Sequence, residues 1–498
     1  MYTEKSTTPS SSRLPWFIGL MGLTIGAFIG LLSGAAPIVV GLLFASILFI
    51  TAFFLKFETV VIFLLCLRVA IDCYVSLQLP TLFALSVNVL TVLYIIVQAF
   101  RKKTIQTDWF FWALLTWWLI QGVWLILMPL NGLGFGIEFF PESLREWVRL
   151  MSWVLVYLLI MQLKGHIHPV KLIHYFFWSL VAPITAAILQ IVAPNVLPGD
   201  LNLNGGDINV QGPTVGESRI RGTLGHSNGF VTYLFMFIGL TQWRLGQSKE
   251  KLLWALVLSI LAFFYVSTKA LYSLMMLAVF ITVLIAPRMS VAKLVGGVLF
   301  FGVILFLFGS SEFGQDRLAS IAKTPLLNPD MDVSRAIILS KGDGNSFNWR
   351  IAQWEHVMKQ ADLYPLFGYG LGTSMKISTN SLLPHNDYVR AYAEGGAVGF
   401  SIYVGFLTLQ VGRLVQLIKN SRHSPAQSNF CLTLLALFLG LPFGMLTENI
   451  WSHTMFFFYW YALLAIAGWD WSEESETSTT SSATSIEGDR KPRLLGQL

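Results

Sequence analysis

The chain has 498 residues, of which 55% are hydrophobic and only 12% are charged, and its formal net charge at pH 7 is +6. Soluble globular domains usually carry about a quarter of their residues as Asp, Glu, Lys and Arg, so this composition excludes a soluble globule. We therefore expect an all-α polytopic membrane protein with about 12 to 14 transmembrane helices. The basic residues form no patch interleaved with aromatic residues, so membrane lipid is an expected partner and nucleic acid is not.

Apolar runs long enough to cross the roughly 30 Å of hydrocarbon in a bilayer occur on both sides of a polar stretch near residue 200. The first run is too long for the core of a cleaved signal peptide, so it is expected to be an uncleaved span. The predicted spans are 14–34, 35–55, 59–75, 79–100, 108–130, 144–163, 171–194, 227–245, 251–267, 270–287, 291–309, 387–415, 429–449 and 454–469.

Lys and Arg gather in every second connection between these runs, which is typical of cytoplasmic loops. Both termini are therefore expected in the cytoplasm, and the two long connections are expected at the outer face. The resulting segments are a cytoplasmic N-terminal tail (1–13), an N-terminal transmembrane bundle (14–194), an external Gly/Pro-rich loop (195–226), central transmembrane helices (227–309), a large external loop (310–384), C-terminal transmembrane helices (385–469) and a disordered cytoplasmic tail (470–498).

His385 and Asn386 close the large external stretch and lead into the next apolar run. A titratable imidazole at the mouth of a transmembrane segment can hold a proton for chemistry, while the run behind it fixes its depth. The alternative is that His385 only caps or anchors its helix. Glu394 follows Arg390 by four residues, which predicts an intrahelical ion pair, and Glu448 at the end of a later run is a weaker candidate of the same kind.

Four cationic side chains lie at expected outer boundaries of the membrane. Arg219 and Arg221 end a Gly-rich loop, and Lys269 lies between two apolar runs. Arg350 lies in the stretch 349–360, whose spacing predicts a short amphipathic helix. Guanidinium groups bind phosphate through paired hydrogen bonds, so these positions predict an anion site. The alternative for each is an interfacial anchor whose charged head reaches water.

Metal and nucleotide sites are not indicated. The three cysteines lack the spacing of metal ligands. Gly368, Gly370 and Gly372 follow no predicted strand, so they predict a flexible turn rather than a nucleotide-binding loop. Asp330 and Asp332 look like the acidic pair of metal-dependent sugar transferases, but the soluble fold of those enzymes is not indicated. We therefore expect neither a metal nor a cofactor.

The region around His385 resembles the bacterial O-antigen ligase and Wzy-type O-antigen polymerase superfamily. The pattern of that superfamily is His, then Asn, Ser or Gln, nine variable residues, Gly, two variable residues and a second small residue. His385, Asn386, Gly396 and Gly399 match it in full. Supporting stretches follow the family order, and the resemblance covers about residues 219–469. The chain departs at Lys269, where Ser-Thr-Lys-Ala stands in place of the common Ser-Arg-Gly-Ala.

This resemblance implies a helical membrane glycosyltransferase of C-type architecture in the bacterial inner (plasma) membrane, with its active site facing the periplasm or exterior. The implied donor is a glycan on undecaprenyl diphosphate, and the implied acceptor is a hydroxyl of another glycan or a lipid. The residues implied are His385 as catalytic base, Arg221, Arg350, Arg219 and Lys269 at the diphosphate, and Asn386 and Glu394 in supporting positions. A transporter or flippase of lipid-linked sugars is the alternative, and inverted repeats with broken spans would favour it.

Overall fold

The computed structural model describes residues 37–197, 201, 219–286, 346–378 and 381–471, together with isolated positions between 295 and 339. The chain divides into two units, residues 1–61 and 62–498. The first contains α2 (Pro37–Leu55), an apolar helix. The predicted span 14–34, most of the span 291–309, the tail from 472 onward, and Asp330 with Asp332 lie outside the described residues.

Every secondary-structure element in the described part is a helix or a single helical turn, which confirms the predicted all-α class. Several helices agree closely with the predicted spans, because long apolar runs between polar connections specify them. The remaining helices are α3 (Phe57–Ala70), α4 (Leu79–Phe100), α5 (Trp109–Leu127), α6 (Phe140–Met161), α7 (Pro169–Phe176), α8 (Val181–Val192), α9 (Ser227–Gln247), α10 (Lys251–Ser267), α11 (Leu271–Ile285), α15 (Ser346–Ala361), α16 (Ser374–Ile377), α17 (Asp387–Asn420), α18 (Pro425–Gly444) and α19 (Thr454–Ala467).

Five helical stretches in the described part are long and apolar enough to cross a membrane, and four further apolar helices are shorter. The longest of the five is α17, and one, Pro169–Val192, joins α7 to α8 through the 3₁₀ turn Phe177–Leu180. Large apolar side chains such as Phe100, Leu252 and Phe263 are exposed on these helices, as they are where helices face lipid. The chain is a polytopic membrane protein.

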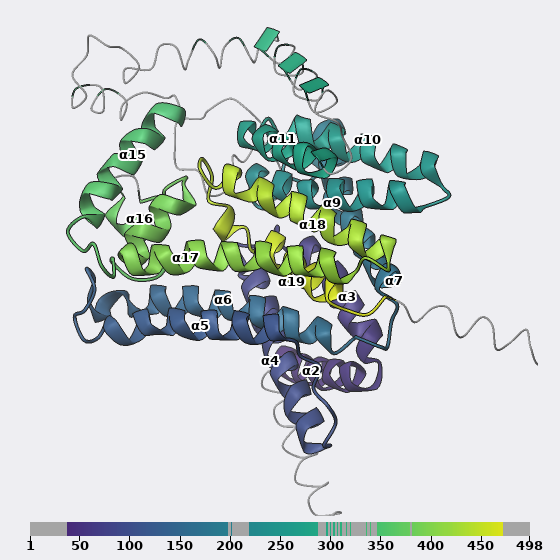
Figure 1. Cartoon of the computed structure of the whole chain (residues 1–498). Coiled ribbons are helices and arrows are strands. Elements are labelled where there is room, and N and C mark those ends of the chain that lie inside the picture. The colour runs from purple at the N-terminus through teal and green to yellow at the C-terminus, as the bar shows by residue number, and fades with distance from the viewer. Residues whose placement is uncertain are drawn as a thin grey trace, which may run out of the picture. The chain divides into compact units, whose positions relative to one another are not determined.

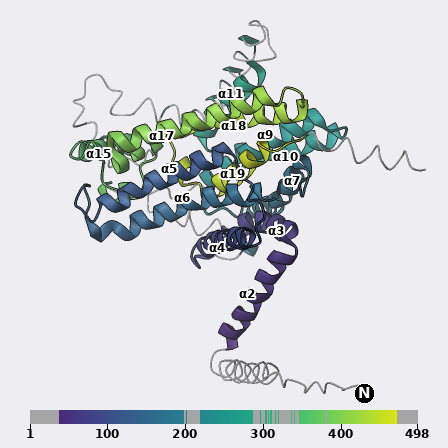
Figure 2. The same ribbon diagram turned by 60° about the horizontal axis from the view of Figure 1, so that its bottom comes forward.

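Within the second unit, α5, α6 and α17 run beside one another (Figures 1 and 2). Trp118 on α5 and Trp147 on α6 stack with their ring centroids 4.2 Å apart, and each indole N–H donates to the other's backbone carbonyl. Such paired donors are satisfied without water, which suits a helix contact in hydrocarbon. α19 forms the centre of the unit, since its residues from Met455 to Ala467 are all buried.

α17 is broken at Gly396, and the break receives the segment that follows α15. Gly396 has a φ of 62°, and a Cβ there would lie 2.3 Å from the carbonyl carbon of Leu366. The freed backbone N–H of Ala397 donates to Pro365 O at 2.7 Å. Only glycine combines this φ with such a close approach. The structure therefore explains why a glycine stands at this position of the motif.

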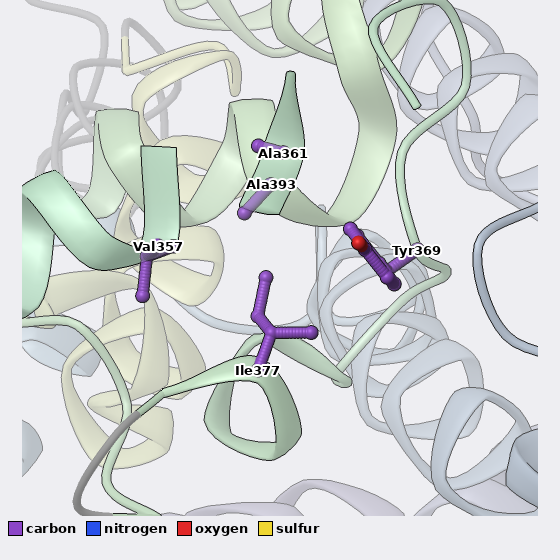
Figure 3. Close-up of a cluster of buried hydrophobic side chains, with 5 residues drawn as sticks. All are labelled: Val357, Ala361, Tyr369, Ile377 and Ala393. Atoms are coloured by element: carbon purple, nitrogen blue, oxygen red, sulfur yellow. The ribbon is translucent and has the colours of Figure 1, made fainter. Parts of the chain in front are cut away.

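The turn with Gly368, Gly370 and Gly372 is packed against the same break, whereas the sequence predicted a flexible turn. All three glycines have positive φ. The N–H of Gly370 donates to the carbonyl of Glu394 at 2.9 Å, and Tyr369 makes the same bond to Ala393. A buried apolar cluster joins this turn to α15, α16 and α17 (Figure 3), and its members are Val357, Ala361, Tyr369, Ile377 and Ala393. These contacts fix α15 against the start of α17.

Candidate functional site

The connection between α18 and α19, residues 445–453, carries a buried carboxylate that joins three other segments. Glu448 Oε2 accepts a hydrogen bond from the Asn228 side chain at 2.5 Å, at the start of α9. Its Oε1 lies 3.2 Å from His385 Nδ1, just before α17. Arg350 of α15 approaches Oε2 to 3.8 Å. We call Glu448, His385, Arg350 and Asn228 the Glu448 cluster.

His385 is fixed by its neighbours but keeps part of its side chain open, with 18% of it exposed. The ring of Trp349 packs edge-on against the imidazole, with the centroids 5.4 Å apart. The next residue, Asn386, caps α17, since its side-chain oxygen accepts hydrogen bonds from the N–H groups of Tyr388 and Val389 at 2.9 and 3.1 Å. An N-cap of this kind defines where the helix begins. Asn386 therefore determines the position of His385 at the helix mouth.

Arg350 offers donors beyond those it uses. Its Nη1 donates to Thr447 O at 2.9 Å, which ties α15 to the α18–α19 connection. Its Nε is buried and has no hydrogen-bond partner among the described residues. The side chain is 22% exposed. A guanidinium that is held in place, partly open and incompletely bonded suits the binding of an anion.

Arg219 reaches the Glu448 cluster through Asn228. Its Nη2 donates to the Asn228 side-chain oxygen at 3.2 Å, and its Nε donates to the backbone carbonyl of Thr268 at 2.9 Å. Lys269 follows Thr268 in the turn between α10 and α11 and is exposed, with a φ of 53°. Arg219 thus connects the turn that carries Lys269 to the carboxylate beside His385.

Arg221 is placed differently, because only 1% of it is exposed. The side-chain oxygen of Gln190 accepts hydrogen bonds from the backbone N–H groups of Arg221 and Gly222 at 3.1 and 2.9 Å. These bonds anchor the segment to α8. Of the predicted site residues, His385 and Arg350 contact Glu448 directly and Arg219 reaches it through one amide, whereas Arg221 is enclosed in the protein.

Glu394 belongs to a second buried network, the Glu394 cluster of Glu394, Arg390, Glu146 and Arg149. The predicted ion pair between Arg390 and Glu394 is present, with Nε 2.9 Å from Oε1. Arg390 also binds Glu146, which in turn binds Arg149. Glu394 accepts further bonds from the N–H of Gly372 and the hydroxyl of Ser374. The cavity beside this network measures about 40 Å³, which is room for water but not for a sugar.

The electrostatics of the Glu448 cluster are set by its few partners. Burial alone raises the pKa of Glu448, but the adjacent His385 and Arg350 outweigh it and hold that pKa well below its usual range. Burial lowers the pKa of His453 to about 4, although nearby Glu448 opposes the change and His226 and His385 add to it. Glu448 is therefore a charged carboxylate near neutral pH, and His453 is neutral. In the described part of the chain, no group of three His, Cys, Asp or Glu side chains could hold a metal ion.

The sequence singled out His385, Arg350 and Arg219 but not the group that joins them. Glu448 appeared only as a minor ion-pair candidate. One signal was available for Glu448, since a carboxylate at the end of an apolar run is costly unless it is paired. The identity of its partners depends on tertiary packing, because 63 residues separate it from His385.

In a comparison with known families, residues 253–404 match the family model described as O-antigen ligase. No curated protein matches the chain. The matched segment contains Lys269, Arg350 and His385, together with the broken start of α17, and it ends before Glu448. The resemblance read from the His385 pattern is thereby confirmed. Residues 253–404 are therefore similar to the O-antigen ligase family.

Proposed function

We propose that this protein transfers a glycan from undecaprenyl diphosphate to an acceptor hydroxyl at the external face of a bacterial inner membrane. The family match supports a glycosyltransferase role of the O-antigen ligase or polymerase type. The proposal of a donor diphosphate and an acceptor hydroxyl rests on one observation, which is that His385 and Arg350 both contact Glu448. A partly open base and a partly open guanidinium, joined by one buried carboxylate, are the two groups that such a transfer requires.

The proposed reaction is a single displacement. The acceptor hydroxyl oxygen attacks the anomeric carbon as its proton passes to His385, and the bond from that carbon to the diphosphate oxygen breaks. The bonding electron pair stays on the diphosphate, which leaves as undecaprenyl diphosphate. His385 acts as general base, and the configuration at the anomeric carbon inverts. Atoms and charge balance without any further reactant.

Arg350 is the group proposed to meet the charge that builds on the leaving diphosphate. Its guanidinium is a planar fork of donors that fits a phosphate, and its Nε has no hydrogen-bond partner in the described part of the chain. Arg219, half-buried and linked through Asn228, is the second proposed diphosphate residue. Preorganised cations in a site with little water are worth more than the same charges in solution. Lys269 and Arg221 remain candidates for the outer and inner margins of the donor site.

The fold supports placing this chemistry at the external face. His385 precedes α17, whereas Arg413 near its other end pairs with Asp108 at the start of α5. The connection that follows α17 is rich in Lys and Arg, as cytoplasmic loops are. The start of α9 and the end of α18 lie with His385 in the Glu448 cluster. The whole cluster is therefore proposed to face the periplasm or exterior.

The test is transfer by the purified protein, supplied with a lipid-linked glycan and an acceptor in detergent. We expect a new glycosidic bond and released undecaprenyl diphosphate. His385→Ala should reduce turnover on the order of 10²-fold or more and leave donor binding nearly unchanged, because it removes a general base. Movement of the donor across proteoliposomes without a new bond would overturn the proposal in favour of a transporter. A monodisperse His385→Ala protein with normal turnover would leave His385 as a helix anchor.

Deletion of the protein in its host separates the two forms of the reaction. Loss of a polymerase leaves single-repeat products attached to the acceptor. Loss of a ligase leaves long chains stranded on the lipid carrier. Glycan profiles of the deletion strain therefore decide which acceptor, a growing lipid-linked chain or a terminal lipid, the site serves.

A further inference from the structure

Glu448 is buried with 4% of its side chain exposed, so each of its oxygens depends on protein partners. Oε2 accepts from Asn228 and lies near Arg350. Oε1 accepts from the backbone N–H of Asn449 at 3.2 Å and faces His385 Nδ1. A buried carboxylate costs several kcal/mol unless it is paired and hydrogen-bonded, and this one is both. Glu448 is therefore maintained as an anion beside the imidazole.

An ionised carboxylate can only accept hydrogen bonds. The His385 nitrogen that faces it must therefore carry the proton, which leaves Nε2 with the lone pair. The edge contact with Trp349 restricts rotation of the ring, so the choice of nitrogen is maintained. The same carboxylate stabilises the imidazolium that forms once Nε2 has taken a proton.

We propose that Glu448 is the positioning residue of this transferase, which fixes the His385 tautomer that can act as base and couples that base to Arg350. The inference rests on the proposed function and extends it. Through Asn228, the same carboxylate also reaches Arg219. One buried side chain thus sets the relative positions of the base and of both proposed diphosphate residues.

The groups around Glu448 show why an amide cannot replace it. Asn228 Nδ2, the Asn449 N–H, Arg350 and the His385 ring all direct donors toward its two oxygens. In Glu448→Gln, an NH₂ group must replace one oxygen. If it donates to Nδ1, the His385 proton moves to Nε2 and the base is lost. If it faces Asn228 instead, two donors oppose each other.

The test compares Glu448→Gln and Glu448→Asp with the wild type in the transfer assay. We expect Glu448→Gln to reduce kcat on the order of 10²-fold, because the loss falls on the base. The donor KM should change by less than about threefold, because Arg350 and Arg219 keep their bonds to the carbonyls of Thr447 and Thr268. Glu448→Asp should recover part of kcat, since it keeps the charge on a shorter side chain. In a His385→Ala background, Glu448→Gln should reduce kcat little further, since the two residues act as one unit.

Asp108→Asn is the matched control. Asp108 is also a carboxylate that binds an arginine, Arg413, and a hydroxyl, Tyr157, but it lies roughly 40 Å of helix away from His385. Asn can keep its cap on α5. We expect this variant to keep wild-type kcat while its melting temperature falls. The control therefore shows whether the loss of a buried carboxylate lowers kcat through stability alone, without any effect on the base.

Each outcome distinguishes the two hypotheses. Absence of transfer by the wild type overturns the proposed function and this inference together. Transfer by the wild type that His385→Ala abolishes but a folded Glu448→Gln retains overturns the inference alone. If Glu448→Gln does not fold, Glu448→Asp decides: reduced kcat at constant donor KM supports the inference, and a wild-type kcat or a rise in KM alone overturns it.

Discussion

The Glu448 cluster and the Glu394 cluster both lie near the start of α17, yet they differ in the groups that their buried carboxylates hold. In the Glu394 cluster, Arg390 lies between two carboxylates, and Glu394 also accepts from the Gly372–Ser374 segment. In the Glu448 cluster, one carboxylate serves His385 and Arg350, both partly open. Burial and charge alone therefore do not mark a site. Chemistry is expected where a buried carboxylate holds a partly exposed group that can accept a proton, as His385 can.

The largest effect on stability is expected from Arg390→Met. The change leaves Glu394 and Glu146 buried without their shared cation, and breaking a buried pair in this way costs about 3–5 kcal/mol. Lys359→Met is the control, because Lys359 pairs with Glu355 at the surface and is 70% exposed, where a pair contributes under about 1 kcal/mol. Melting temperatures in one detergent measure both. An equal fall in melting temperature in the two variants would show that the Glu394 cluster does not stabilise the fold.

Variants of Arg350 test whether this residue of the Glu448 cluster binds the donor diphosphate. Arg350→Ala is expected to weaken donor binding and to reduce turnover by about 10-fold to 100-fold, since its contacts are made with both the ground state and the transition state. Arg350→Lys should recover only part, because an ammonium keeps the charge but not the planar fork. Donor affinity and transfer rate are measured for both variants. Wild-type donor affinity in a folded Arg350→Ala protein would contradict a diphosphate role.

The helices and the position of His385 were predictable from the sequence because both depend on local pattern. Apolar runs gave α4 and α10 their observed bounds, and the His-Asn pattern located the mouth of α17. The ion pair of Arg390 with Glu394 was also predicted, since four residues separate them on one helix. The partners of Glu448 come from three other segments that only the packed bundle brings together. Local periodicity carries no information about such contacts.

The glycine turn shows the same limit. The sequence has glycines at 368, 370 and 372 and predicted flexibility, since glycine alone permits many conformations. The structure instead uses their positive φ values to fit the turn into the break at Gly396. A glycine can make a turn flexible, or it can let two backbones pack closely. Which of the two occurs depends on the segment that packs against the glycine, and here that segment is distant in sequence.

Gly396→Ala tests this close approach and is expected to have a moderate effect. A Cβ would meet the backbone of Leu366 at 2.3–2.4 Å. The extended conformation with positive φ at this residue costs about 1–3 kcal/mol more for a non-glycine residue. Gly405→Ala in the same helix is the control, because nothing lies within 4 Å of its added Cβ and alanine favours a helix by about 1 kcal/mol. A lower melting temperature is expected for the first variant only. Equal melting temperatures would show that the turn can move away from α17.

The smallest effect is expected from removal of divalent metal. If the protein's own cations neutralise the diphosphate, transfer should continue at its normal rate in excess chelator, because the partly open guanidinium groups of Arg350 and Arg219 supply fixed positive charge. The measurement is the initial rate with and without chelator, followed by addition of Mg²⁺ or Mn²⁺. The double variant Asp330→Asn with Asp332→Asn should likewise keep its rate. A rate that falls in chelator, returns with metal and is lost in the double variant would make that acidic pair a metal site, and the arginines would then share the diphosphate with an ion.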